Sequence, residues 1–335
     1  MSKAICVLLQ PLEKYFAQKD VKEIIAINSG YVGLERDLTG WEEVKDDAID
    51  NEYWSRLCSV TANVNGVMFD EITQPILSAV LPGGHRIEVM KGNNVASKLS
   101  VTIRVKRNIK WELADFGLDH NTVNGLIKLI RLGVRIVISA GTNGGKTSFL
   151  NALVQYINGA KAEQNIRTLT VEDAREIDLE DTRFSPQYVV SRNENDASVD
   201  YNKVLDHLVR SNPTYIILGE ISVKNAYHAI RMLNTGHEGF LCTVHANSPI
   251  DALNKAFPQN TRMTGIDSNE IGEWMHDLID MVIQLKSTKD GKRVSEIYLP
   301  KIKKSKLFNF EENAEINISD LIEFENNGKN VKDVI

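Results

Sequence analysis

Residues 140–147 have the composition and spacing of a phosphate-binding loop. The run reads Ala-Gly-Thr-Asn-Gly-Gly-Lys-Thr, a Walker A pattern with alanine in place of the usual first glycine. Backbone N–H groups in such a loop, followed by a helix N-terminus, form a cradle for an anion. The side chain of Lys146 then contacts the β- and γ-phosphates, and the hydroxyl of Thr147 ligates Mg²⁺. The expected cradle consists of Gly141, Thr142, Asn143, Gly144, Gly145, Lys146, Thr147 and Ser148.

Two carboxylates follow apolar runs in the same part of the chain. Glu220 ends the run Tyr-Ile-Ile-Leu-Gly-Glu, which has the shape of a Walker B strand. It can hold a water of a Mg²⁺ ion or polarise the attacking water. Glu172 ends a second apolar run and is followed by Asp173. An ionised carboxylate there can act as a general base, and an exposed acidic turn is the alternative interpretation.

Two histidines, His237 and His245, flank a short apolar segment. A zinc site would be one explanation for such a pair, but no third or fourth ligand has suitable spacing. Histidines can also donate hydrogen bonds to phosphate. A structural role for each histidine stays open at this point.

An alternation of strands and helices is expected to position these groups. Helices are predicted over 121–131, 199–210 and 224–233, and another is predicted to follow the phosphate loop directly after Thr147. Strands are predicted over 136–138, 166–171, 215–218 and 240–244. Such alternation predicts an α/β sheet with helices on both faces, where ligands sit beyond the carboxyl ends of the strands. The loop, Glu172, Glu220 and His245 all follow strands and should therefore converge on one crevice.

The first hundred residues have a different pattern. Residues 21–27 and 31–35 predict a hairpin around Asn-Ser-Gly, and a helix is expected over about 50–63. Further strands are predicted over 75–81, 85–90 and 100–105, with Pro-Gly-Gly as a tight turn between the first two. We therefore expect an α+β domain over 1–108, a linker over 109–120, a nucleotide-binding domain over 121–300 and a polar tail over 301–335.

Composition and charge exclude several classes of protein. The chain of 335 residues has 42% hydrophobic residues and a net charge of −6, so no global basic field favours direct binding of nucleic acid. No apolar run is long enough for a membrane span, and the first ten residues do not resemble a signal peptide. Three scattered cysteines argue against a disulfide framework. A basic cluster near 301–306 is interpreted as a solvated surface.

The four blocks in this order resemble the secretion-ATPase superfamily, the hexameric ring ATPases of type II and type IV secretion and of type IV pili. They correspond to its Walker A, Asp box, Walker B and His box, and the segment TGHEGFLCTVHANSPIDAL is the most specific. The N-terminal segments EIIAINSGYVGLERDLTGWEEV, PILSAVLPGGHRIEVM and SVTIRV are similar to the N-terminal domain of the traffic ATPase of type IV secretion and conjugation systems. The resemblance implies a RecA-like P-loop ATPase domain preceded by a smaller α+β domain.

The resemblance also implies roles for residues. Glu172 matches the Asp-box glutamate, a general base, and Glu220 matches the Walker B glutamate. His237 and His245 match the His-box histidines near the γ-phosphate, and Arg86 and Arg104 match arginines that reach the phosphates from the N-terminal domain. ATP and Mg²⁺ are the implied cofactors. The implied assembly is a homohexamer on the cytoplasmic face of the bacterial inner membrane, peripherally associated with inner-membrane and cytoplasmic components of a secretion system.

Three departures from the family pattern bear on activity. Asn143 and Gly144 stand where Gly-Ser is usual, and Ser222 stands where arginine often follows the Walker B triplet. The segment 210–214 before Walker B reads Arg-Ser-Asn-Pro-Thr and keeps one arginine where Arg-x-Arg-Pro-Asp is common. Asparagine tolerates a left-handed backbone better than most residues, so the loop can keep its shape. The expected function is an ATP-hydrolysing motor of type IV secretion. The alternatives are a pilus or type II secretion motor, a nucleic-acid motor, and an ATP-sensing docking module without significant turnover.

Overall fold

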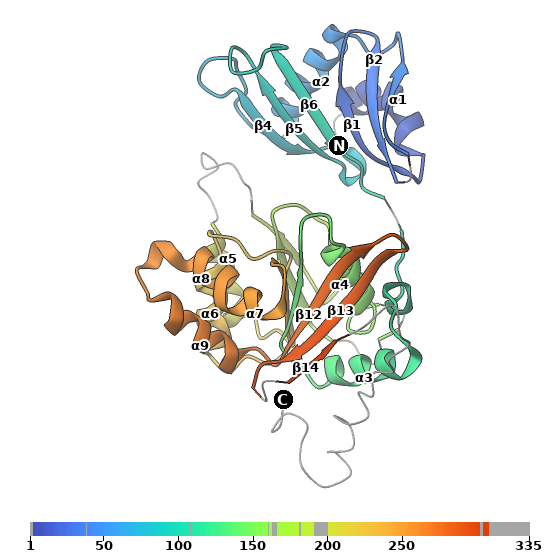
Figure 1. Cartoon of the computed structure of the whole chain (residues 1–335). Coiled ribbons are helices and arrows are strands. Elements are labelled where there is room, and N and C mark those ends of the chain that lie inside the picture. The colour runs from blue at the N-terminus through green and yellow to red at the C-terminus, as the bar shows by residue number, and fades with distance from the viewer. Residues whose placement is uncertain are drawn as a thin grey trace. The chain divides into compact units, whose positions relative to one another are not determined.

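The computed structural model describes residues 3–37, 39–107, 109–159, 161–162, 166–180, 182–190, 200–301 and 304–307. The chain forms two compact units, and the first of them ends at Ile109 (Figure 1). The second unit begins at Lys110. The polar tail expected over 301–335 lies outside the described residues, except for 301 and 304–307.

The first unit is built on an antiparallel sheet of six strands in the order β3-β2-β1-β6-β5-β4. The strands are β1 Val21–Ala26, β2 Tyr31–Arg36, β3 Gly40–Lys45, β4 Ile76–Val80, β5 Arg86–Lys91 and β6 Leu99–Arg104. Its helices are α1 Lys3–Phe16 and α2 Asn51–Val64, and a 3-10 turn covers Pro82–Gly84. The predicted hairpin over 21–35 and the predicted helix over 50–63 are confirmed.

Helices α1 and α2 bury one face of this sheet. Ile5, Leu9 and Leu12 of α1 recur at helical spacing and are almost fully buried in the core of the unit. Helix α1 is not among the predicted elements, although its apolar residues have this helical spacing. Ile87 and Ile103 supply the core from the sheet side, so the alternate residues of β5 and β6 point away from the helices.

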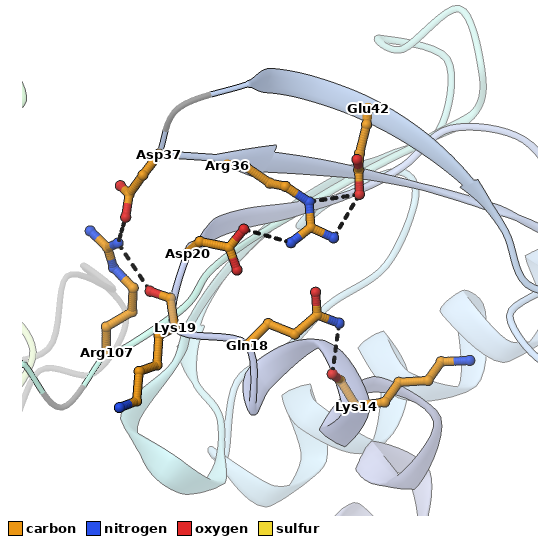
Figure 2. Close-up of polar contacts among 8 residues, drawn as sticks. All are labelled: Lys14, Gln18, Lys19, Asp20, Arg36, Asp37, Glu42 and Arg107. Atoms are coloured by element: carbon orange, nitrogen blue, oxygen red, sulfur yellow. Dashed lines mark hydrogen bonds and ion pairs between the residues drawn. The ribbon is translucent and has the colours of Figure 1, made fainter.

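Ion pairs fix the end of the first unit where the β2–β3 turn lies (Figure 2). Arg36, at the end of β2, donates to Glu42 of β3 at 2.7 Å and to Asp20, just before β1, at 2.9 Å. Arg107, after β6, donates to Asp37 at 2.5 Å. These contacts hold the last described residues before 108 against the β2–β3 turn.

The second unit is built on a sheet of eight strands in the order β14-β13-β12-β7-β11-β10-β8-β9. The strands are β7 Ile136–Ala140, β8 Thr168–Glu172, β9 Gln187–Val189, β10 Tyr215–Leu218, β11 Phe240–His245, β12 Met281–Thr288, β13 Gly291–Leu299 and β14 Lys304–Leu307. Strands β12, β7, β11, β10, β8 and β9 are parallel, and β13 and β14 add antiparallel pairs at one edge.

Helices cover both faces of this sheet. The helical elements are the 3-10 turn Leu113–Phe116, α3 His120–Arg131, α4 Lys146–Val154, α5 Tyr201–Arg210, α6 Ala226–Leu233, α7 Pro249–Asp251, a π-helical turn Ala252–Ala256, α8 Phe257–Thr261, a 3-10 turn Arg262–Thr264 and α9 Ser268–Leu278. One core holds Ile136 and Ile138 of β7 together with α3 and α4. The other holds Val137 with α5, α6, α8 and α9. Alternate residues of one strand therefore serve opposite layers, as the predicted α/β fold requires.

Parts of the second unit differ from the elements that the sequence predicts. Leu113 and Phe116, in the segment expected to be a linker, are buried in the core of the second unit. The hairpin of β12 and β13 was not predicted. No helix among the described residues has the length and apolarity to cross a lipid bilayer.

Candidate nucleotide-binding site

The phosphate loop connects the carboxyl end of β7 to the first turn of α4. Its chain turns back on itself where the N–H of Gly144 donates to the carbonyl of Gly141 at 3.1 Å. Asn143 has a φ of 56° and Gly145 a φ of 87°, so two left-handed residues shape the turn before the helix begins. Asparagine is among the side chains that adopt this conformation most readily, and the expected loop shape is present.

Lys146, Glu220 and His245 lie together beside this loop. The ammonium Nζ of Lys146 is 3.0 Å from Nδ1 and 3.1 Å from Nε2 of His245. It is 4.0 Å from a carboxylate oxygen of Glu220. Nε2 of His245 lies 2.8 Å from the same oxygen. Three residues far apart in the sequence thus meet because β7, β10 and β11 end at one edge of the sheet.

The surroundings of His245 favour the neutral form of its ring. Burial lowers the pKa of His245, the Lys146 charge lowers it further, and Glu220 opposes both effects. A neutral ring accepts from Lys146 at Nδ1 and donates through Nε2–H to Glu220, because lysine has donors only and a carboxylate accepts. Lys146 is itself buried, with 8% of its side chain exposed, while Glu220 is 44% exposed. Glu220 is therefore the member of the pair with Lys146 that is accessible to solvent.

Glu172, the expected general base, is held by the backbone of the loop that follows β8. It is buried, and its Oε1 accepts hydrogen bonds from the backbone N–H groups of Glu176 and Ile177, each at 2.9 Å. Its side chain packs on Gly219, the residue before Glu220. A Cβ atom placed on Gly219 would be 2.9 Å from Cγ of Glu172. The carboxylate of Glu172 thus fixes the loop after β8 against the end of β10.

That loop brings in Glu176, a residue the sequence analysis did not single out. The hydroxyl of Thr147 donates to Oε2 of Glu176 at 3.2 Å, and Asn151 of α4 donates to its carbonyl at 2.9 Å. The sequence contains a sign of this role, because a second glutamate follows Glu172 by four residues in the acidic segment after β8. A carboxylate therefore lies next to the hydroxyl expected to bind Mg²⁺.

His237 is not brought to this cluster. It precedes Phe240, where β11 begins, whereas His245 ends that strand, and a six-residue strand is about 16 Å long. Gly239 donates to the carbonyl of Gly133, before β7, so this end of β11 lies at the amino edge of the sheet. Burial lowers the pKa of His237, and its Nε2 has no hydrogen-bond partner among the described residues. Within one chain His237 and His245 therefore lie at opposite ends of β11.

The remaining predicted residues fall in two places. Thr142 and Ser148 belong to the loop and to the first turn of α4. Arg86 and Arg104 are paired across β5 and β6 in the first unit, on the sheet face away from the helices. Ser222 accepts at its Oγ from the N–H of Lys224 and shapes the turn before α6. The part of the chain that the structure describes has no cluster of three metal-ligating His, Cys, Asp or Glu side chains.

A family model described as "Type II/IV secretion system protein" matches residues 51–285. This chain belongs to that family. The matched range includes the phosphate loop, Glu172, Glu220 and both histidines. The predicted assignment to the secretion ATPases is confirmed, and with it the expectation of a P-loop ATPase.

Individual secretion proteins resemble the chain over most of its length. A type IV secretion system protein VirB11 of Bartonella quintana is 26% identical over 90% of this chain and 94% of its own. A conjugal transfer protein TrbB of Rhizobium radiobacter is 29% identical over 67% of each chain. The solved structure of the Legionella pneumophila ATPase DotB covers 99% of this secretion ATPase and 86% of its own chain, at 14% identity and a TM-score of 0.58. That likeness confirms the fold.

Proposed function

We propose that this secretion ATPase is a hexameric motor that hydrolyses ATP to energise transport or pilus assembly by a type IV secretion system. The observation that carries the proposal is the cluster of Lys146, His245 and Glu220 at the mouth of the phosphate loop. The VirB11 protein that resembles nine tenths of this chain supports the choice of a type IV system. A pilus or type II secretion motor is the alternative within the family.

In this proposal nucleotide binding changes the partners of Lys146. Lys146 leaves Glu220 and His245 for the β- and γ-phosphates, which the loop amides also bind. Glu220 is then available to orient the attacking water, and it is more accessible than the buried Glu172. His245 can then direct its Nε2–H at the γ-phosphate.

The oxygen ligands present suit a magnesium ion. Mg²⁺ is typically held by one or two carboxylates together with substrate phosphates and water. The hydroxyl of Thr147 and the carboxylates of Glu176 and Glu220 would supply the protein side of such a site. When bound, the ion would neutralise charge that develops on the phosphates.

The other implied elements are part of the same proposal. Arg86 and Arg104 would add positive charge to the phosphates, a contribution that can be worth about 10³–10⁵ in rate for an arginine on the transition state. The hexamer would bind inner-membrane and cytoplasmic components of the secretion system from the cytoplasmic side, as a peripheral protein. Direct nucleic-acid binding is not part of the proposal.

Replacing Lys146 by alanine tests the site. We expect phosphate release from ATP to fall by about 10²-fold or more, because the loop loses its phosphate-binding cation. Glu220→Gln should retain ATP binding, measured by calorimetry, and lose turnover. Circular dichroism of both variants controls for folding. Hydrolysis by Lys146→Ala at the wild-type rate would contradict the site, and ATP binding by the wild type without turnover would favour a docking module.

Light scattering after size exclusion tests the assembly. A hexamer stabilised by a non-hydrolysable ATP analogue is expected, because binding to the assembled form favours it by mass action. A monomer in every nucleotide state would contradict the motor.

A further inference from the structure

The hairpin of β12 and β13 extends past the point where the phosphate loop begins. Strand β12 runs parallel to β7, and their last pair joins Leu285 to Ala140, the first residue of the loop. Beyond that pair β12 continues to Thr288, and the chain returns from Gly291. The tip of the hairpin therefore lies at the edge of the sheet where nucleotide binds.

One lysine of this tip lies against the phosphate loop. A Cβ atom placed on Gly145 would be 3.0 Å from Cγ and 3.2 Å from Cβ of Lys292, so the aliphatic stem of that lysine covers the loop backbone. Its Nζ donates to the hydroxyl of Ser287, the cross-strand partner of Lys292, at 2.7 Å. The side chain is half-buried. The phosphate loop thus positions the methylene groups of Lys292, which in turn place its ammonium group near the loop.

The neighbouring residue holds the hairpin in place. Arg293 donates from Nη1 to the carbonyl of Asp115, and a Cβ on Gly117 would be 2.8 Å from Cδ of Arg293. The hairpin is therefore anchored on the turn that precedes α3. Val294, the next residue, is buried in the same core as α4. This packing restrains the backbone from which Lys292 projects.

We propose that Lys292 is a second lysine of the nucleotide site and contacts the α- and β-phosphates. The inference rests on the proposed ATPase function. The backbone around Gly145 belongs to the segment whose N–H groups cradle these two phosphates, whereas Lys146 serves the β- and γ-phosphates. A rotation about the last bonds of the Lys292 side chain would direct its ammonium group at a phosphate oxygen, and a hydrogen bond between two charged groups is stronger than one to a neutral hydroxyl.

This placement predicts a kinetic signature. ADP and ATP have the same α- and β-phosphates, so Lys292 stabilises both equally and contributes uniform binding. Loss of its charge should raise KM for ATP and the Kd for ADP by the same factor, about fivefold, and reduce kcat less than twofold. The dependence of the ADP Kd on ionic strength should become weaker.

Substitutions can separate charge from packing. Lys292→Met keeps the stem over Gly145 and removes the charge, Lys292→Arg keeps the charge, and Lys292→Ala removes both. Lys289→Met is the matched control, because Lys289 is an exposed lysine of the same tip. Calorimetry with ADP and steady-state hydrolysis of ATP are the measurements. The inference requires weaker ADP binding in the Met variant, recovery in the Arg variant and no change in the control.

The outcomes also distinguish this inference from the proposed function. If Lys292→Met binds ADP as the wild type does while Lys292→Ala does not, the side chain only packs on the loop and the inference is overturned. If Lys289→Met weakens binding as much as Lys292→Met, the effect is one of general charge and the inference also fails. If the wild type binds neither ADP nor ATP, the proposed function itself fails.

Discussion

Gly144 and Ala140 share a space with room for one Cβ atom. A Cβ placed on Gly144 would lie 2.4 Å from Cβ of Ala140 and 2.9 Å from the carbonyl oxygen of Gly141, and the first distance is far below van der Waals contact. The Walker A pattern usually has glycine at the position of Ala140, and serine is usual in this family at the position of Gly144. The glycine at position 144 therefore makes room for the methyl group of Ala140, which explains how the loop retains a phosphate-binding shape.

The shared space predicts strong coupling between these residues. Gly144→Ser alone should lower kcat/KM for ATP by about tenfold or more, because the loop must shift to relieve the contact. The double variant Ala140→Gly with Gly144→Ser should recover part of the activity, because the contact with Ala140 is removed and that with the carbonyl oxygen of Gly141 stays. A double-mutant cycle on kcat/KM and on the ADP Kd gives the coupling energy, which we expect to exceed about 1 kcal/mol. Additive effects of the two substitutions would contradict the shared space.

Strand β11 has a histidine near each end, and the fold gives these histidines different surroundings. His245 meets Lys146 and Glu220 at the carboxyl edge of the sheet. His237 lies before the strand, at the edge where Gly239 bonds to Gly133. Ligands bind at the carboxyl edge of a parallel sheet, so we expect only His245 to serve the nucleotide of its own chain.

Separate substitutions should reveal this difference. His245→Gln should lower kcat by about tenfold or more, because a hydrogen-bond donor near the γ-phosphate is lost. His237→Gln should leave kcat within about twofold when hydrolysis is measured at protein concentrations too low for the subunits to assemble. A loss in His237→Gln that appears only in the assembled protein would place His237 in the site of a neighbouring subunit. An equal loss in both variants of the unassembled protein would contradict the placement of His237.

At the scale of the molecule, the first unit has its own pH sensitivity. Buried His85 stacks on Phe16 of α1 with ring centroids 3.8 Å apart, and its Nδ1 accepts from the N–H of Lys106 at 3.0 Å. Burial, with a smaller effect from the Lys106 charge, lowers the pKa of His85 to about 4. The unfolded chain binds a proton near the ordinary value of 6.5, so the folded unit prefers the neutral ring.

The first unit should therefore lose stability as the pH falls from about 6.5 to about 4, by up to about 3 kcal/mol from this group. His85→Asn keeps an acceptor for Lys106 and does not titrate in this range, so its free energy of unfolding should depend less on pH. Hydrogen exchange of residues 3–107 in the full chain, compared between pH 7 and pH 5, measures the effect. An equal pH dependence in the two proteins would contradict a role for His85.

The sequence predicts the parts of this molecule whose pattern is local. The Walker A loop, the strands before Glu220 and His245, and their meeting at one edge follow from residues close together in the chain and from the general behaviour of parallel sheets. The Asn143 backbone follows from the preferences of a single side chain. These are the features that the structure reproduces.

Other features depend on contacts between distant segments. Lys292 reaches Gly145 only because β12 inserts next to β7, a pairing that no local pattern records. Glu172 was predicted to act on water, and its two backbone partners became visible only with the turn after β8. The spacing of the two histidines was read as one motif, although the strand between them carries them to opposite edges of the sheet.

The position of β7 in the sheet also makes the completion of its pairing a late event in synthesis. β7 lies between β11 and β12, and β12 begins only at Met281. A nascent chain that has exposed the phosphate loop but not residue 281 still has an unpaired apolar strand beside that loop. Until then the bare edge of β7 is an unpaired apolar strand edge, the kind of surface through which partly synthesised chains aggregate.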